Sequence, residues 1–171
     1  ERLPNTLLLM GSATALSFGL GSVLGIVAGA KPGSFRDRFL SVGSLALYAV
    51  PSFWLGLVLI VIFAVRLRWL PIGGIETIAS ASTGFAHAAD IAVHLVLPVA
   101  ALGFIYLALY LRMMRAGMAE VWRMDFILAA RARGLSRRRI VIVHVARNAL
   151  LPLITMLGLQ SAQMLGGSVV I

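Results

Sequence analysis

Residues 6–30 read TLLLMGSATALSFGLGSVLGIVAGA, an apolar stretch that contains no charged side chain. A helix needs about 20 such residues to cross the hydrocarbon core of a bilayer, so the stretch predicts a membrane-spanning helix. Gly21, Gly25 and Gly29 recur at intervals of four residues and fall on one face of this helix. Small residues on one face let a second helix approach closely. Packing within the chain is the simpler interpretation, and a dimer interface is the alternative.

Three further apolar segments follow, at residues 39–65, 91–111 and 149–171. The chain of 171 residues is 60% hydrophobic and 12% charged, whereas a soluble domain carries about 25% charged residues. We therefore expect an all-α fold, a polytopic transmembrane helical bundle that forms a single domain over residues 1–171. The chain begins without Met and stops inside an apolar run, so we expect it to be a segment of a larger protein.

Positive charge alternates along the three connections between these segments. Residues 31–38 hold three basic side chains, residues 66–90 hold two, and residues 112–148 hold nine. Because basic loops remain in the cytoplasm, we expect the first and third connections there and the second one outside. This topology accounts for the net charge of +9 and for the run Arg137–Arg139. Membrane lipid is therefore an expected partner, and nucleic acid is not.

A few residues in the predicted spans are unusual at membrane depth. Pro51 and Pro98 each remove a backbone hydrogen-bond donor and predict kinks. In the fourth segment Gln160, Ser161 and Gln163 carry polar groups, which we expect to face other helices or a water-filled path rather than lipid. We take Ser52, which follows the predicted kink at Pro51, together with Gln160 and Gln163 as candidates for the translocation path. Hydrogen bonding between helices is the alternative.

The residues that usually carry chemistry form no motif. The chain has no cysteine, and His94 and His144 do not form a metal-ligand motif, so no metal site is expected. The patterns Gly-x-Ser-x-Gly and His-Glu-x-x-His are absent, as is an intramembrane pair of Asp residues. We therefore expect no catalytic residues in this chain.

The third connection carries the signals of a helix-turn-helix. Asp125 is a good N-cap and strong helix formers follow it, which predicts a helix over residues 126–133. Gly134 stands where a left-handed residue would end that helix, and Ser136 can cap a second one. Residues 140–145 are mostly β-branched, which favours a strand. We still expect a helix there, because an isolated strand would leave its backbone groups unpaired.

Phe126, Ala129, Ala130 and Arg133 share one face of the predicted helix, at the spacing i, i+3, i+4 and i+7. That face is small and partly basic. We expect it to enter a groove on another protein rather than to bury a core of its own.

The stretch DFILAARARGLS at residues 125–136, followed by RNALLP at 147–152, resembles the EAA loop of binding-protein-dependent importer permeases. It is most similar to the dipeptide, oligopeptide and nickel branch of the ATP-binding cassette transporters. RLPNT at 2–6, PSFWLG at 51–56 and HLVLP at 94–98 also resemble segments of the first permease subunit of that branch. The resemblance covers essentially the whole chain.

This resemblance implies an assembly of several subunits. Two permease subunits, usually different ones, would pair in the membrane, and their EAA helices would insert into clefts of two cytoplasmic ATPase subunits. A binding protein outside the membrane would deliver the substrate. The chain contains no Gly-x-x-x-x-Gly-Lys-Ser/Thr loop, so we expect it to bind no cofactor and its partner subunits to hydrolyse ATP.

The resemblance also implies which residues carry the coupling contact. Ala129, Ala130 and Gly134 take the Ala, Ala and Gly places of the motif. The expected ATPase-coupling residues are Asp125, Phe126, Ala129, Ala130, Arg133 and Gly134. Leu128 stands where the general motif has Glu, so a contact made by that Glu does not carry over.

The expected function is the ATP-driven import of dipeptides or oligopeptides across the inner membrane of a bacterium or archaeon. A permease of the same branch for nickel or glutathione-like compounds is one alternative. A passive channel or membrane scaffold is the other, because it explains the spans and the loop charges equally well.

Overall fold

A computed structural model describes the backbone of residues 3–74 and 84–169 and the side chains of residues 4–74 and 84–161. The regular elements of this part are all helical, which confirms the expected fold class. They are α1 (Leu3–Gly29), α2 (Phe35–Ala49), α3 (Ser52–Leu59), η1 (Ile60–Arg66), α4 (Phe85–Val121), α5 (Asp125–Ala132), α6 (Arg137–Arg139), η2 (Ile140–Ala146) and α7 (Arg147–Val169). The segments η1 and η2 are π-helical.

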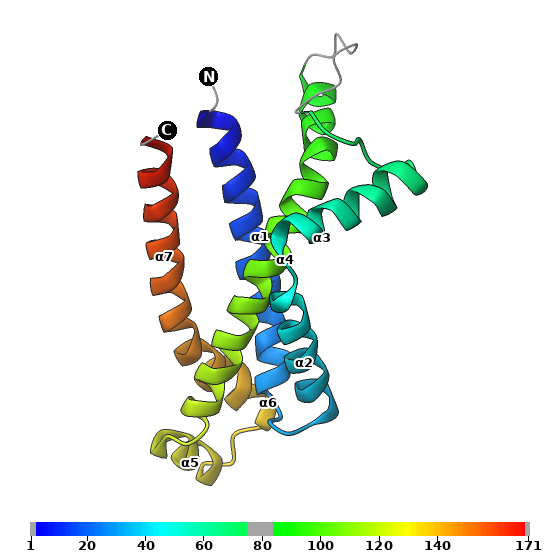
Figure 1. The fold of residues 1–171 in the computed structure, drawn as a ribbon. Helices are drawn as coiled ribbons and strands as arrows, with labels where there is room; N and C mark the ends of the chain where they lie inside the picture. The colour runs from blue at the N-terminus through cyan, green and yellow to red at the C-terminus, as the bar shows by residue number, and fades with distance from the viewer. Residues whose placement is uncertain (1–2, 75–83, 170–171) are drawn as a thin grey trace.

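The bundle is elongated, and α1, α4 and α7 run along its length (Figure 1). The beginnings of α1 and α4 and the end of α7 lie at one end of the bundle, whereas α5 and α6 lie at the opposite end together with the beginning of α2 (Figure 1). The basic connections at 31–38 and around α5 and α6 therefore share one end. This arrangement agrees with the cytoplasmic side that the charges predict for both.

Three segments of the described chain are long and apolar enough to cross a membrane, namely Pro4–Gly29, Phe85–Val121 and Arg137–Ser161. A fourth crossing would come from the bent pair Phe35–Ala49 and Ser52–Arg66. The prediction of a span at 6–30 agrees with α1.

The span predicted at 39–65, with a kink at Pro51, is divided into two helical pieces, because the chain breaks at Val50 and Pro51. Helices α2 and α3–η1 meet there at 99°. Val50 is extended, with φ −79° and ψ 127°. The residue before a proline is driven out of the helical region by the proline ring. Pro51 therefore ends one helix and precedes another, which is a larger effect than the predicted kink.

Helix α4 is longer than the predicted span at 91–111. It continues through RMMRAGMAEV at 112–121, so Arg112 and Arg115 lie on a helix rather than in a loop. Most of these residues are good helix formers, and the methionines at 114 and 118 are fully buried. The sequence argument counted the arginines and missed the apolar face between them. Pro98 lies within α4 without ending it.

The glycine face of α1 packs against α4. A Cβ atom added at Gly21, Gly25 or Gly29 would lie 2.7, 2.5 or 2.8 Å from a Cβ atom of α4. The side chains approached in this way belong to Tyr110, Met114 and Met118. These distances are shorter than a contact between two carbon atoms, so a side chain at any of these three glycine positions would overlap α4. Packing within the chain, the simpler of the two interpretations, is confirmed for these glycines.

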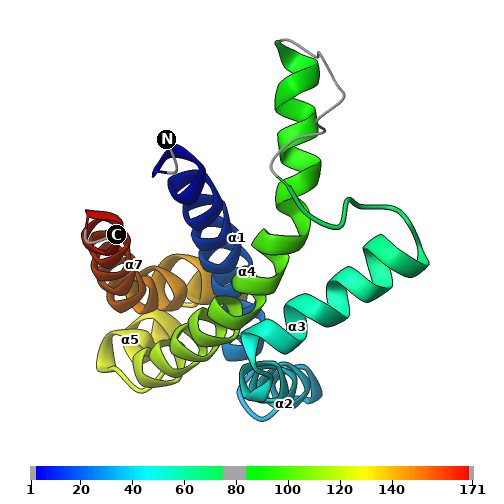
Figure 2. The same ribbon diagram turned by 45° about the horizontal axis from the view of Figure 1, so that its top comes forward.

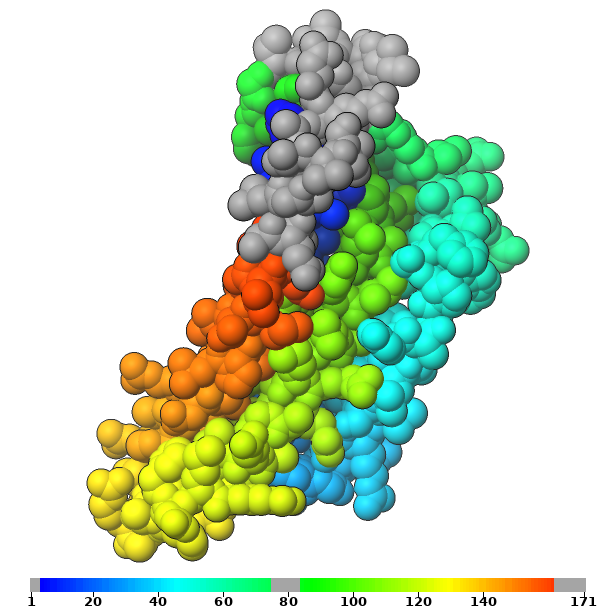
Figure 3. Space-filling view, turned by 60° about the vertical axis from the view of Figure 1, so that its left-hand side comes forward, coloured from blue at the N-terminus to red at the C-terminus, as the bar shows by residue number. Residues whose placement is uncertain are grey.

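Helix α4 packs against α1, α2, α3 and α7. Figure 2 shows α7 on one side of α4 and the α2–α3 pair on the other. Figure 3 shows α4 uncovered between them over much of its length. The face of α4 that α1 covers is thus closed, and another face is open.

Candidate coupling site

Helix α5 begins one residue earlier than predicted, at Asp125 rather than at residue 126. Met124 is the N-cap, with φ −77° and ψ 144°, and its side chain makes no capping hydrogen bond. The predicted cap, Asp125, is instead the first helical residue. Its carboxylate still lies in the first turn, where negative charge favours a helix N-terminus. The prediction of Asp125 as the N-cap is therefore wrong, although its effect on the helix has the same sign.

The end of α5 follows the sequence prediction. Gly134 has φ +74°, and its N–H donates to the Arg131 carbonyl at 2.9 Å. The Leu135 N–H donates to the Ala130 carbonyl at 3.3 Å. These two bonds form a Schellman turn, which needs a left-handed residue and so favours glycine.

The second helix also begins where predicted, because the Ser136 hydroxyl accepts a hydrogen bond from the Arg139 N–H at 3.4 Å. From there α6, η2 and α7 follow one another directly. The β-branched stretch at 140–145 is helical, as expected.

One face of α5 rests on the bundle. The exposed fractions of Ile127 and Ala130 are 1% and 0%. Both belong to a core cluster with residues of α4, η2 and α7, among them Met118 and Val145. The prediction that Ala130 lies on an exposed docking face is therefore wrong for this chain. An eight-residue helix stays on a bundle only if it buries one face, and here Ile127 and Ala130 form it.

The opposite face of α5 is exposed. Its residues are Asp125, Leu128, Ala129 and Ala132, at i, i+3, i+4 and i+7. We call these four residues the coupling face. Leu128 is 65% exposed, so most of this aliphatic side chain lies outside the core of the described chain. Phe126, 40% exposed, and Arg133 border this face. The exposed face is thus shifted by about one residue from the predicted face, and it includes Leu128, which the prediction did not.

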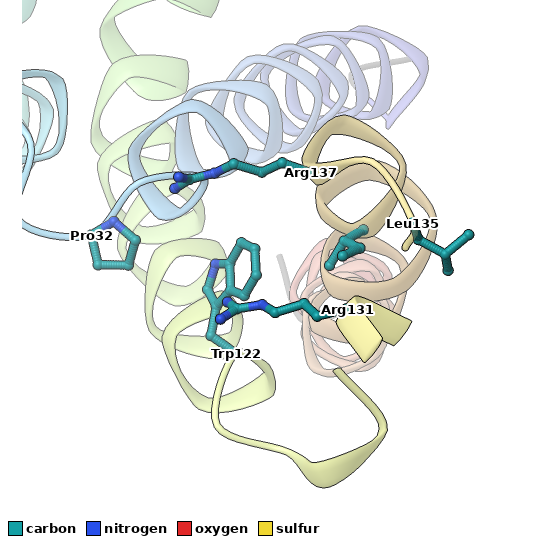
Figure 4. A pocket seen from close by; sticks show the side chains of 6 residues that line it. Pro32, Trp122, Arg131, Leu135 and Arg137 are labelled. Atoms are coloured by element: carbon teal, nitrogen blue, oxygen red, sulfur yellow. The ribbon is translucent and has the colours of Figure 1, made fainter. Parts of the chain in front are cut away.

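The end of α1 is held by hydrogen bonds to the end of α4 and to α6. The Trp122 indole N–H donates to the Gly29 carbonyl at 2.9 Å, and the Arg131 guanidinium lies 5.1 Å from the Trp122 ring centroid. Arg137 donates to the Ala30 carbonyl at 3.1 Å. Figure 4 shows both arginines reaching across a pocket of about 480 Å³ towards Trp122 and the end of α1. The sequence analysis missed these ties, because they join residues far apart in the chain.

A buried ion pair joins the beginning of α2 to α4. Asp37 is 1% exposed, and its carboxylate accepts hydrogen bonds from Arg115 Nε and, at 3.0 Å, from Arg115 Nη2. The Gly33 N–H and the Ser41 hydroxyl also donate to it, at 2.8 and 3.3 Å. This pair fixes the connection at 31–38 against α4. An acidic residue within a basic loop was the signal that could have found it.

The predicted path residues do not come together. Ser52 is exposed at the start of α3 and lines a pocket of about 460 Å³ beside α4. Gln160, on α7, accepts a hydrogen bond from the Tyr110 hydroxyl of α4. Helices α3 and α7 lie on opposite sides of α4 (Figure 2). The bond to Gln160 is of the helix–helix type that stood as the alternative. The side chain of Gln163 lies outside the described residues.

Nothing in the described part of the chain suggests a metal site. Across residues 3–74 and 84–169, no three His, Asp or Glu side chains come together as metal ligands would. The Nδ1 atom of His94 lies 2.9 Å from the carbonyl oxygen of Asp90, one turn earlier in α4.

Comparison with known sequences now gives these features a family. Residues 21–171, which include α4, the coupling face and α7, match the family described as binding-protein-dependent transport system inner membrane component. The chain belongs to this family. Its place is therefore the inner membrane, which agrees with the apolar helices of the structure. The resemblance drawn from residues 125–136 and 147–152 is confirmed.

Similar proteins of this family are peptide permeases by name. The di/tripeptide transport system permease protein DppB of Pseudomonas aeruginosa is 40% identical over 182 residues, covering 97% of this chain and 54% of that protein. The oligopeptide transport system permease protein AppB of Bacillus subtilis is 39% identical, covering 99% of this chain and 52% of that protein. The dipeptide transport system permease protein DppB of Escherichia coli is 35% identical, with 98% and 55% covered. The chain spans about half the length of these relatives.

Proposed function

We propose that this chain is the membrane-spanning part of a permease subunit in an ATP-driven importer of dipeptides or oligopeptides. The names of the similar proteins support the substrate class. The single observation that carries the coupling role is the exposed coupling face of α5 above a fully buried base. An apolar side chain such as Leu128 that is held outwards on a rigid helix fits insertion into a partner's cleft.

The proposed partners follow from the family. They are a second permease subunit, two cytoplasmic ATPase subunits and an external substrate-binding protein. ATP is hydrolysed by the ATPase subunits, because this chain carries no phosphate-binding loop and binds no cofactor of its own.

In this proposal ATP moves the coupling faces, and the movement passes to the spans. When ATP closes the two ATPase subunits, each α5 is carried with its ATPase subunit. Ile127 and Ala130 join that displacement to the core, and Trp122 and Arg137 join it to the end of α1. Tight packing transmits a displacement as a shift between discrete arrangements, so the bundle changes the side of the membrane to which it opens.

A pair of neighbouring cysteine substitutions tests the coupling role. These 171 residues contain no cysteine, so Ala129→Cys and Ala130→Cys each place a single thiol in this part of the protein. The variants are made in the full-length permease with its partner subunits present. A bifunctional reagent should crosslink position 129 to an ATPase subunit, identified by mass, whereas position 130 should not react because it is fully buried. A cysteine at exposed Trp69, at the opposite end of the bundle, should capture no ATPase.

A labelled but uncrosslinked Ala129→Cys, with the ATPase subunit demonstrably bound, would exclude α5 as the coupling contact. Substrate flux that follows its gradient without ATP would favour a passive channel instead.

A further inference from the structure

A groove runs along α4 on the side of α2 and α3. It consists of two pockets of about 710 and 460 Å³ that share Tyr48 and Leu109. The first is lined by Ser41, Leu45, Tyr48, Leu109, Arg112, Met113, Arg115 and Ala116, and the second by Tyr48, Val50, Ser52, Leu102, Ile105, Tyr106 and Leu109. No residue of α1 or α7 lines either pocket. The groove therefore belongs to the open face of α4 (Figure 3).

The groove is apolar along its walls but carries polar groups at intervals. Leu45, Leu109 and Met113 are aliphatic, whereas Tyr48 and Tyr106 offer hydroxyl groups. Arg112 directly follows the apolar segment 91–111, and a charged side chain at the edge of such a segment usually turns towards water rather than along the apolar wall.

Arg112 is directed into the groove. Its guanidinium lies 5.9 Å from the centroid of the Tyr48 ring. Helical side chains lean towards the N-terminus of their own helix, and the N-terminus of α4 lies at the end of the bundle away from α5 (Figure 1). Arg112 therefore reaches away from the basic end of the bundle.

The charge of Arg112 is available to a ligand. Its neighbour Arg115 is engaged by Asp37, whereas among the described residues no carboxylate lies within ion-pair distance of Arg112. Tyr48 supplies only the face of its ring to it. A guanidinium of this kind presents a rigid set of N–H donors that matches a carboxylate in two parallel hydrogen bonds.

We propose that this groove holds a peptide in transit and that Arg112 receives the carboxylate at the peptide's C-terminus. This proposal rests on the proposed function and names the chemical group that the permease itself recognises. Every free dipeptide or oligopeptide ends in this carboxylate, whatever its side chains. The aliphatic walls and tyrosines then accept varied side chains, and the pockets have the size of ordinary ligand sites, about 300–1,000 Å³.

The test measures occupancy of the groove directly and needs no ATP. In the full-length permease with its partner subunits in lipid nanodiscs, Leu109→Cys puts one thiol at the residue that both pockets share. Alanyl-alanine at millimolar concentration should slow maleimide labelling of this thiol several-fold, and its C-terminal amide should not. Adding Arg112→Gln should raise the peptide concentration needed for protection by at least about tenfold, the effect of losing charge-assisted hydrogen bonds.

Two control variants make the result specific. Val23→Cys places an exposed thiol on α1 outside the groove, and peptide should not protect it. Arg66→Gln removes the same charge from the end of η1 and should leave protection at position 109 unchanged.

Equal protection by the peptide and its amide, or protection that survives Arg112→Gln, would overturn the proposal. Labelling at 109 that is blocked without peptide would also overturn it. If the block depends on the second permease subunit, the groove is a subunit interface, and if it depends on anionic lipid, Arg112 binds a headgroup. Protection without ATP-dependent uptake would contradict the proposed function and leave the groove standing. Uptake without protection would do the reverse.

Discussion

The two sides of α4 show opposite ways of packing in a membrane. Against α1 the backbones approach so closely that a Cβ atom on Gly25 would lie 2.5 Å from that of Met114. Against α2 and α3 the same helix leaves a groove of two pockets, bordered by Tyr48 and Arg112. Lipid tails are as apolar as the side chains, so close contact rather than the hydrophobic effect holds helices together there. The closed side is thus a rigid scaffold, and the open side has room for a ligand.

Helix α5 repeats this contrast on a smaller scale. Ile127 and Ala130 are buried on the bundle, whereas Leu128 and Ala129 face outwards. In both places a fixed side supports a side that is free to bind.

The largest expected effect comes from closing the space between α1 and α4. Gly25→Leu should lower the stability of the protein by about 3 kcal/mol, because the added side chain overlaps Met114 and overpacking is not relieved by small shifts. Thermal unfolding in detergent measures it. Gly19→Leu is the matched control, since a Cβ atom at Gly19 has nothing within 4 Å. Equal losses in both variants would show that the close approach of α1 to α4 does not set the effect.

The next effect concerns the ion pair that holds α2 beside the open groove. Arg115→Gln should destabilise the protein by about 2 kcal/mol, because it leaves the buried Asp37 carboxylate without its cation. The loss of stability is smaller than for a fully buried ion pair, because the Arg115 side chain is partly exposed to water. The double variant with Asp37→Asn should recover most of the loss in the same unfolding assay. A double variant no better than Arg115→Gln alone would exclude the uncompensated charge as the cause.

A change in the coupling face should alter function and not stability. Leu128→Ala should weaken binding of the ATPase subunit about tenfold, which corresponds to about 1.4 kcal/mol, while the unfolding temperature remains unchanged. Leu128 is exposed, so the folded chain alone loses little. Ile142→Ala, another exposed aliphatic residue, is the control. Titration with labelled ATPase subunit measures the affinity. Equal affinities of both variants and the unaltered protein would contradict the assignment of the coupling face.

The smallest expected effect is at the hydrogen bond between Trp122, at the end of α4, and the end of α1. Trp122→Phe removes the hydrogen bond to the Gly29 carbonyl but keeps a ring beneath Arg131, so it should cost about 1 kcal/mol of stability. Backbone amide hydrogen exchange should rise at residues of α5 more than at the middle of α1. Unchanged exchange in α5 would mean that the buried face alone positions this helix.

Predictions from the sequence were most accurate where a signal was local. The span predicted at 6–30 agrees with α1 (Leu3–Gly29), Gly134 ends α5 in the left-handed region, and Ser136 caps the next helix. Each of these outcomes depends on apolar length or on the chemistry of one turn, and neighbouring residues carry that information.

The prediction failed where distant residues decide. Ala130 has the composition of a docking residue, but its burial depends on Met118 and Val145, which the chain brings from other helices. The Asp37–Arg115 pair and the Tyr110–Gln160 bond likewise join residues that no local pattern connects.

The sequence by itself determined the membrane class and the helix-turn-helix near residue 134, and it predicts the sidedness of the loops. These follow from transfer free energies, charge and backbone propensities, which act residue by residue. Only the tertiary structure decided the 99° bend after Val50, the outward face of α5 and the groove that holds Arg112. Which face of a helix is covered depends on the shape of the neighbour it meets, and that shape exists only once the helices have packed.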